Sequence, residues 1–143
     1  MRWATGSRRP ARPPRAADLR AVRRPALRAS GRRLVTLTNG STGVSEQLFT
    51  AAGVRDEFEA LLSVEDAGAW KPARAAYDYA ARACGTDPAE MLLVAVHPWD
   101  IDGAARAGLI TAWIHRAGTP YPECFTPSSL RATGLDDLAA QLA

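Results

Sequence analysis

One lysine stands out among the residues of this sequence that could do chemistry. Lys71 is the only lysine in 143 residues, and the other 17 basic residues are arginines. A lysine ammonium is a compact charge with three rotatable donors, whereas the planar fork of arginine is suited to bidentate contacts. Lys71 precedes Pro72 at the expected start of a helix, where the helix dipole disfavours a cation. A solvated surface lysine is the ordinary alternative, but the single occurrence and this position favour a specific charge.

Four further polar residues could share a site with this lysine. Thr38 and Asn39 end an apolar segment, and they could hold a carboxylate or phosphate together with the backbone N–H groups that follow. An N-cap with a tight turn is the alternative for both residues. Asp100 falls in the first turn of an expected helix, where capping is the alternative role. Tyr77 lies six residues after Lys71 on the same expected helix, where core packing is the alternative.

The elements that must position these residues begin at residue 33, where apolar and β-branched segments start to alternate with helical patterns. Strands are predicted at 33–39, 60–64, about 91–96 and 109–115; helices at 41–53, 71–85, 98–107 and 134–143; and a proline-rich loop at 117–127. Such alternation predicts an α/β fold with a parallel sheet and right-handed crossovers. Parallel sheets place their sites in the loops beyond the carboxyl ends of the strands, which is where the polar residues above fall.

Charge divides the chain into two regions. Residues 1–33 contain 11 arginines and one acid, whereas residues 34–143 contain 7 basic and 14 acidic residues. We expect residues 1–23 to be a disordered or mis-started Arg/Pro/Ala-rich segment, and residues 24–143 to form the domain. A basic arm for nucleic acid and a transit peptide are the alternatives for the first segment. The low aromatic content of that segment makes nucleic acid an improbable partner.

The remaining composition is that of a globular protein, with 47% hydrophobic and 23% charged residues. No apolar run approaches the length of a membrane span. Cys84 and Cys124 match no metal-ligand spacing and no disulfide framework. These features predict a cytoplasmic protein without cofactors or a membrane partner.

The segments that carry these residues resemble the type II haloacid dehalogenases, within the haloacid dehalogenase-like hydrolase superfamily. "LVTLTNGS" at 34–41 is similar to the second motif of the superfamily, and "WKP" at 70–72 is similar to its third. "HPWDIDGAARAGL" at 97–109 is similar to the fourth motif with the helix that follows it. The resemblance covers about residues 24–143 and implies a Rossmann-like, three-layer core with a parallel sheet.

The resemblance also implies roles for the site residues. In the family an aspartate displaces halide from a short 2-haloacid and forms an ester, which water hydrolyses. Lys71 would keep that aspartate ionised, and Asp100 would orient the lysine. Thr38 and Asn39 would bind the substrate carboxylate, and Tyr77 would position the lysine and the substrate.

Three departures from the family pattern carry expectations of their own. This chain has His97 where phosphate-transferring relatives place a metal-binding acid, which favours metal-free chemistry. His97 could orient water, and capping or packing is its alternative role. Dehalogenases usually have serine where this chain has Ala95, so water positioning or substrate range could differ. No segment resembles the first motif, which supplies the aspartate and the central strand, and the helical cap that follows it is also missing. The chain is therefore expected to be truncated and inactive.

The missing central strand carries a structural expectation. The strands are expected either to form two half-sheets across a gap or to pair directly at 34–38 and 92–96, with marginal stability or association, including a homodimer. A non-catalytic interaction protein with a basic arm and a phosphatase relative are the alternative functions.

Overall fold

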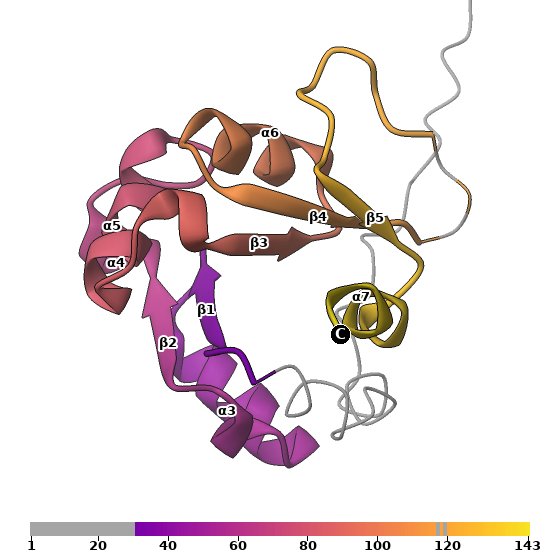
Figure 1. Ribbon diagram of the computed structural model, residues 1–143. Helices are drawn as coiled ribbons and strands as arrows, with labels where there is room; N and C mark the ends of the chain where they lie inside the picture. Colours follow the sequence, from indigo (N-terminus) through magenta and orange to yellow (C-terminus); the bar gives the residue numbers. More distant parts are fainter. Residues whose placement is uncertain (1–30, 117, 119) are drawn as a thin grey trace, which may run out of the picture.

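The computed structural model describes residues 31–116, 118 and 120–143, and the predictions for residues 1–23 lie outside this part of the chain. Strands and helices alternate along it, as the sequence predicts (Figure 1). The elements are β1 (Val35–Thr38), α3 (Thr42–Ala52), η1 (Arg55–Glu57), β2 (Ala60–Ser63), α4 (Val64–Ala67), α5 (Arg74–Cys84), η2 (Pro88–Glu90), β3 (Leu92–Ala95), α6 (Pro98–Arg106), β4 (Ile110–Ile114), β5 (Leu130–Ala132) and α7 (Leu135–Leu142).

The strands form two separate parallel sheets. β1 pairs with β2, while β3 pairs with β4 and β4 with β5. Within the described residues no pairing joins β1 to β3. The α/β class and the parallel pairing are confirmed, and of the two expected arrangements the structure contains the two half-sheets.

Helices cover both faces of these sheets. Tyr77 of α5 and Ala104 of α6 belong to a buried cluster against which Leu37 of β1 and Leu93 of β3 pack. The adjacent residue, Leu92, packs instead on a second cluster, which joins β4 and β5 to Leu138 of α7, because successive side chains of a strand point to opposite faces. One layer therefore contains α5 and α6, and α7 lies in the layer on the other side of the strands (Figure 1).

Several predicted boundaries differ from the structure. The helix predicted to begin at Lys71 begins at Arg74, so Lys71 lies in the loop before α5 and not in its first turn. The strand β5 was not predicted, because three residues carry too little periodicity and this strand is specified by its pairing with β4. The short α4 was also missed; the Ser63 side chain caps it by accepting a hydrogen bond from Glu65 N–H.

The helix α3 has an unusual exposure. Val44 and Leu48 recur at helical spacing, yet they are 56% and 37% exposed, and Ala52 is the only buried residue of this helix. The Val44 and Leu48 side chains of α3 are therefore left largely uncovered by the described chain. No described helix combines the length and the apolar character that crossing a membrane requires.

Candidate active site

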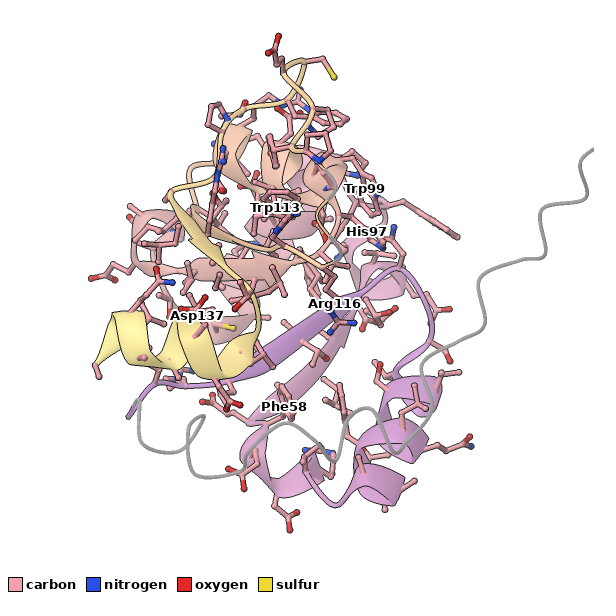
Figure 2. The ribbon with its side chains drawn as sticks, turned by 90° about the vertical axis from the view of Figure 1, so that its right-hand side faces the viewer. Phe58, His97, Trp99, Trp113, Arg116 and Asp137 are labelled. Carbon is pink, nitrogen blue, oxygen red and sulfur yellow. The ribbon has the colours of Figure 1, made fainter. Side chains whose placement is uncertain are left out.

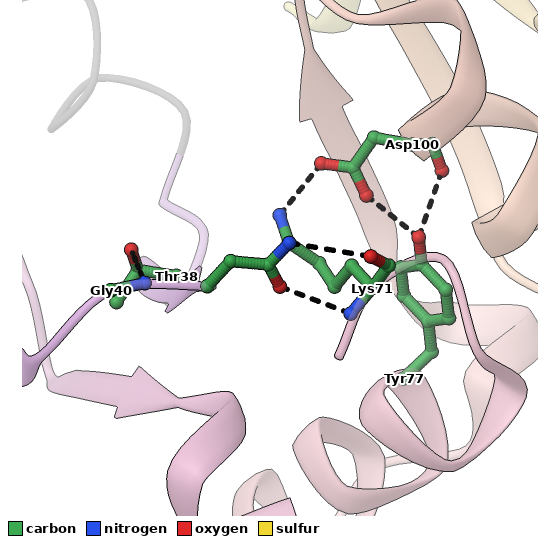
Figure 3. Close-up of polar contacts among 6 residues, drawn as sticks. Thr38, Gly40, Lys71, Tyr77 and Asp100 are labelled. Carbon is green, nitrogen blue, oxygen red and sulfur yellow. Dashed lines mark hydrogen bonds and ion pairs between the residues drawn. The ribbon is translucent and has the colours of Figure 1, made fainter. Parts of the chain in front are cut away.

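An ion pair between Lys71 and Asp100 forms the centre of the candidate site (Figure 3). Lys71 Nζ lies 2.6 Å from Asp100 Oδ2, and only 10% and 6% of the two side chains are exposed. Asp100 lies in the first turn of α6, directly after β3, as the sequence predicts. A pair this well shielded from water is strongly coupled, since removing either partner leaves the other charge buried and uncompensated.

Tyr77 holds the aspartate from the other side. Its side chain is fully buried, and its hydroxyl donates hydrogen bonds to Asp100 Oδ1 at 2.7 Å and to the Asp100 carbonyl at 3.2 Å. Burial and the adjacent Asp100 carboxylate raise the pKa of Tyr77, so its hydroxyl remains a proton donor. Tyr77 thus packs in the core and also orients the carboxylate that pairs with Lys71.

Asn39 fixes the backbone of the lysine. Its Nδ2 donates to the Lys71 carbonyl at 3.3 Å, and its Oδ1 accepts from Lys71 N–H at 3.0 Å. The side-chain amide therefore clamps a residue that lies 32 positions later in the chain. Thr38 Oγ1 accepts from Gly40 N–H at 2.9 Å, which closes the turn after β1. Both side chains lie at the site, and their binding of a substrate carboxylate stays a prediction.

The His97 side chain makes no hydrogen bond or ion pair with these residues, and its catalytic role stays a prediction. It is exposed, its imidazole makes no capping hydrogen bond at the start of α6, and its ring stacks on Trp99 with 5.4 Å between centroids (Figure 2). The Asp102 carboxylate bonds outside this cluster: its Oδ1 accepts hydrogen bonds from the backbone N–H and the hydroxyl of Thr126, which lowers the pKa of Asp102. In the described part of the chain no three His, Cys, Asp or Glu side chains form a metal-ligand group.

Gly103 is a residue of the site that the sequence prediction left without a role. A Cβ at this position would lie 2.5 Å from Pro72 Cβ, 2.8 Å from the Pro72 carbonyl oxygen and 2.7 Å from the Tyr77 hydroxyl. Glycine therefore lets α6 approach the loop that contains Lys71. Gly103 lies within the segment similar to the fourth motif, but the need for glycine there comes from the contact between the loop and the helix, which the sequence does not show.

We expect Gly103→Ala to destabilise the protein by about 1–3 kcal/mol, because the added methyl group must displace backbone and a buried ring. Urea unfolding followed by circular dichroism measures this effect. Gly134→Ala is the matched control, since its backbone is extended and a Cβ there has no heavy atom within 4 Å. Equal unfolding midpoints for the two variants would contradict this account of Gly103.

Comparisons with known proteins identify relatives of this chain. A family model described as haloacid dehalogenase-like hydrolase matches residues 16–108. The chain is 41% identical over 98 residues to haloacetate dehalogenase H-2 of Moraxella sp. (strain B), covering 68% of this chain and 44% of that protein. It is 37% identical over 97 residues to the (S)-2-haloacid dehalogenase of Pseudomonas sp. (strain YL), covering 68% and 42%. The chain thus spans less than half the length of these two relatives.

Solved structures show the same similarity. The L-2-haloacid dehalogenase RSc1362 superposes with a TM-score of 0.79 at 32% identity, covering 84% of this chain and 54% of that one. The L-2-haloacid dehalogenase of Xanthobacter autotrophicus with chloropropionic acid covalently bound gives a TM-score of 0.76 at 23% identity, which supports the fold alone.

Proposed function

The chain belongs to the haloacid dehalogenase-like hydrolases, and from this membership we propose that it supplies the lysine–aspartate half of a site that hydrolyses short 2-haloacids. The observation that carries the proposal is the shielded Lys71–Asp100 ion pair at the carboxyl ends of β1 and β3. The curated relatives above are named as dehalogenases of haloacetate and of (S)-2-haloacids, which favours carbon–halogen bonds over phosphate esters as the substrate class.

The proposed reaction has two steps. A carboxylate nucleophile attacks the carbon that bears the halogen, so that an ester bond forms and halide leaves. Water then attacks the ester carbonyl, which releases the 2-hydroxy acid and a proton and restores the carboxylate. Lys71 acts by charge: its ammonium stabilises the ionised nucleophile, and Asp100 with Tyr77 holds that ammonium in place.

The substrate carboxylate is assigned to the turn after β1. Asn39 contacts Lys71 there, Thr38 precedes it in the chain, and the turn also presents backbone N–H groups at the start of α3. In this proposal the clamp from Asn39 serves both to position the lysine and to form one wall of the substrate site.

The nucleophile is the part of the reaction that the printed sequence leaves unassigned. No aspartate in it belongs to a segment like the first family motif, so we expect no halide release from chain 1–143 alone.

Metal independence is part of the proposal, because His97 stands where phosphate-transferring relatives carry an acid. The free thiols of Cys84 and Cys124 support a cytoplasmic location. The uncovered Val44 and Leu48 of α3 support a homodimer as one way of covering them.

A chimaera tests the function. Residues of the Moraxella haloacetate dehalogenase that precede the matched region are joined to residues 33–143 of this chain, and halide release from chloroacetate and 2-chloropropionate is measured. We expect halide and the corresponding 2-hydroxy acid in equal amounts. The Moraxella portion alone is the control. A chimaera that folds by circular dichroism but releases no more halide than this control would overturn the proposed function.

A further inference from the structure

A cleft at the carboxyl ends of β4 and β5 is lined by aromatic rings. Trp113 lies in β4, His115 follows that strand, and Tyr121 lies in the loop that leads to β5. The Trp113 ring lies 4.8 Å from the His115 ring and 4.9 Å from the Tyr121 ring, measured between centroids. The cleft has a volume of about 390 Å³, within the range of about 300–1,000 Å³ that is typical of small-molecule sites. We call it the aromatic cleft.

Hydrogen bonds hold two of these rings in place. Trp113 Nε1 donates to the Val96 carbonyl at 3.1 Å. The Tyr121 hydroxyl donates to the Thr126 carbonyl at 2.7 Å, and Thr126 is itself bonded to Asp102 of α6. A ligand that enters the cleft therefore meets side chains that are already positioned, which lowers the entropic cost of its binding.

The aromatic cleft also contains a cation. The Arg131 guanidinium lies over two of the rings, with Cζ 5.9 Å from the Trp113 centroid and 5.7 Å from the Tyr121 centroid. These are distances at which a cation and an aromatic face attract each other. Arg131 is exposed, and no acid among the described residues forms an ion pair with it. Its N–H donors are therefore open to an anion from solution.

A carboxylate in the same lining limits the charge of that anion. Asp137 of α7 lines the aromatic cleft without pairing with Arg131 (Trp113 and Asp137 are labelled in Figure 2). Its oxygens accept instead from the Thr133 N–H and hydroxyl and from Gln141 Nε2, at 2.8 to 3.1 Å, and these bonds lower the pKa of Asp137. The ionised Asp137 disfavours a doubly charged ligand. A single guanidinium matches the one charge and two oxygens of a carboxylate.

We propose that the aromatic cleft binds a small planar anion, an aromatic ring that carries one carboxylate. Only 6% of Trp113 is exposed, so the half-buried Tyr121 and His115 supply the accessible ring surface. The ligand ring packs against these two side chains, and its carboxylate accepts two hydrogen bonds from Arg131. Neither Lys71 nor Asp100 lines the cleft, so this inference does not rest on the proposed function.

Titration of the full chain 1–143 with 2-naphthoate tests the proposal. Calorimetry measures the affinity, and nuclear magnetic resonance locates the ligand by changes in the amide signals of Tyr121, Arg131 and Thr133. The neutral 2-naphthamide has the same ring and is expected to bind about tenfold more weakly, because it lacks the charge-assisted bonds. Decahydro-2-naphthoate has the same charge without the aromatic ring and is expected to bind about threefold more weakly.

Matched variants place the ligand in the cleft. Arg131→Gln is expected to weaken naphthoate binding about tenfold, whereas Arg82→Gln makes the same change of charge on the exposed surface of α5 and is expected to leave binding unchanged. Tyr121→Phe keeps the ring and is expected to weaken binding less than Tyr121→Leu, which removes it. Circular dichroism checks that each variant folds.

Four results would overturn the proposal: no binding of naphthoate, equal affinity for naphthoate and naphthamide, equal loss of binding in the two arginine variants, and amide changes that lie outside the cleft. Adenosine monophosphate, whose phosphate is doubly charged, distinguishes a nucleotide from a carboxylate as the planar anion. We expect it to bind more weakly than naphthoate, because Asp137 lies in the lining. Tighter binding of the nucleotide would overturn the assignment of a carboxylate.

Discussion

Lys71→Ala is expected to lower halide release by the chimaera by about 10²–10³-fold, the usual effect of removing one charge-stabilising group from a shielded site. The physical reason is that the ammonium neutralises negative charge at a position where water cannot take over this role. Only 10% of the lysine side chain is exposed to solvent. The measurement is the initial rate of halide release at saturating 2-chloropropionate, with folding of each variant checked by circular dichroism.

Lys71→Arg is the matched control for charge, because it keeps the cation but replaces a compact ammonium with a planar fork. We expect it to recover less than a tenth of the lost rate. Asp100 accepts a hydrogen bond from Lys71 Nζ, and Asn39 holds the backbone of the same residue. Because both ends of the side chain are fixed, the longer guanidinium cannot occupy the position of the ammonium. A Lys71→Ala chimaera that retains a tenth or more of the rate would show that the lysine is not part of the chemistry.

The centre of the candidate site could be predicted from the sequence because of where its residues fall along the chain. Lys71 and Asp100 lie in loops that follow predicted strands, so both are expected at the same edge of a parallel sheet. Their pairing is what the family resemblance implies. The structure places Lys71 Nζ 2.6 Å from Asp100 Oδ2.

The contacts that support this pair could not be read from the sequence. The bond from the Tyr77 hydroxyl to Asp100 depends on how α5 packs on α6, and the closeness of Gly103 to Pro72 depends on the same packing. The sequence predicts substrate binding for Asn39, with local capping as the alternative, whereas in the structure its amide reaches a backbone 32 residues away. In each case a tertiary contact decides the role, and local pattern rules do not contain it.

The fold shows the same division between local and distant information. Periodicity predicts β1 to β4 because each strand is an apolar segment between turn residues. β5 has three residues and is specified by β4 beside it. The uncovered face of α3 is a further case: the spacing of Val44 and Leu48 predicts a helix with an apolar side, but it cannot say what that side contacts.

The largest effect on stability is expected from Asp100→Ala, which should lower the free energy of unfolding of chain 1–143 by about 3–5 kcal/mol. The substitution leaves the Lys71 ammonium in a shielded position without its counter-charge, and it also removes the nearer of the two acceptors of the Tyr77 hydroxyl. Urea unfolding measures the change. Asp78→Ala is the control, because the Arg74–Asp78 pair lies at the surface with N···O at 3.4 Å and is expected to contribute about 0–1 kcal/mol.

A second substitution separates the buried charge from simple loss of packing. If the unpaired ammonium causes the instability, Lys71→Met in the Asp100→Ala background should restore part of the lost stability, because no charge then remains in the shielded position. Tyr77→Phe should cost less than Asp100→Ala, since it removes the hydrogen bonds of one hydroxyl and leaves the ion pair intact. A double variant less stable than Asp100→Ala would mean that Lys71 stabilises the loop by packing, and the electrostatic account of the pair would then be wrong.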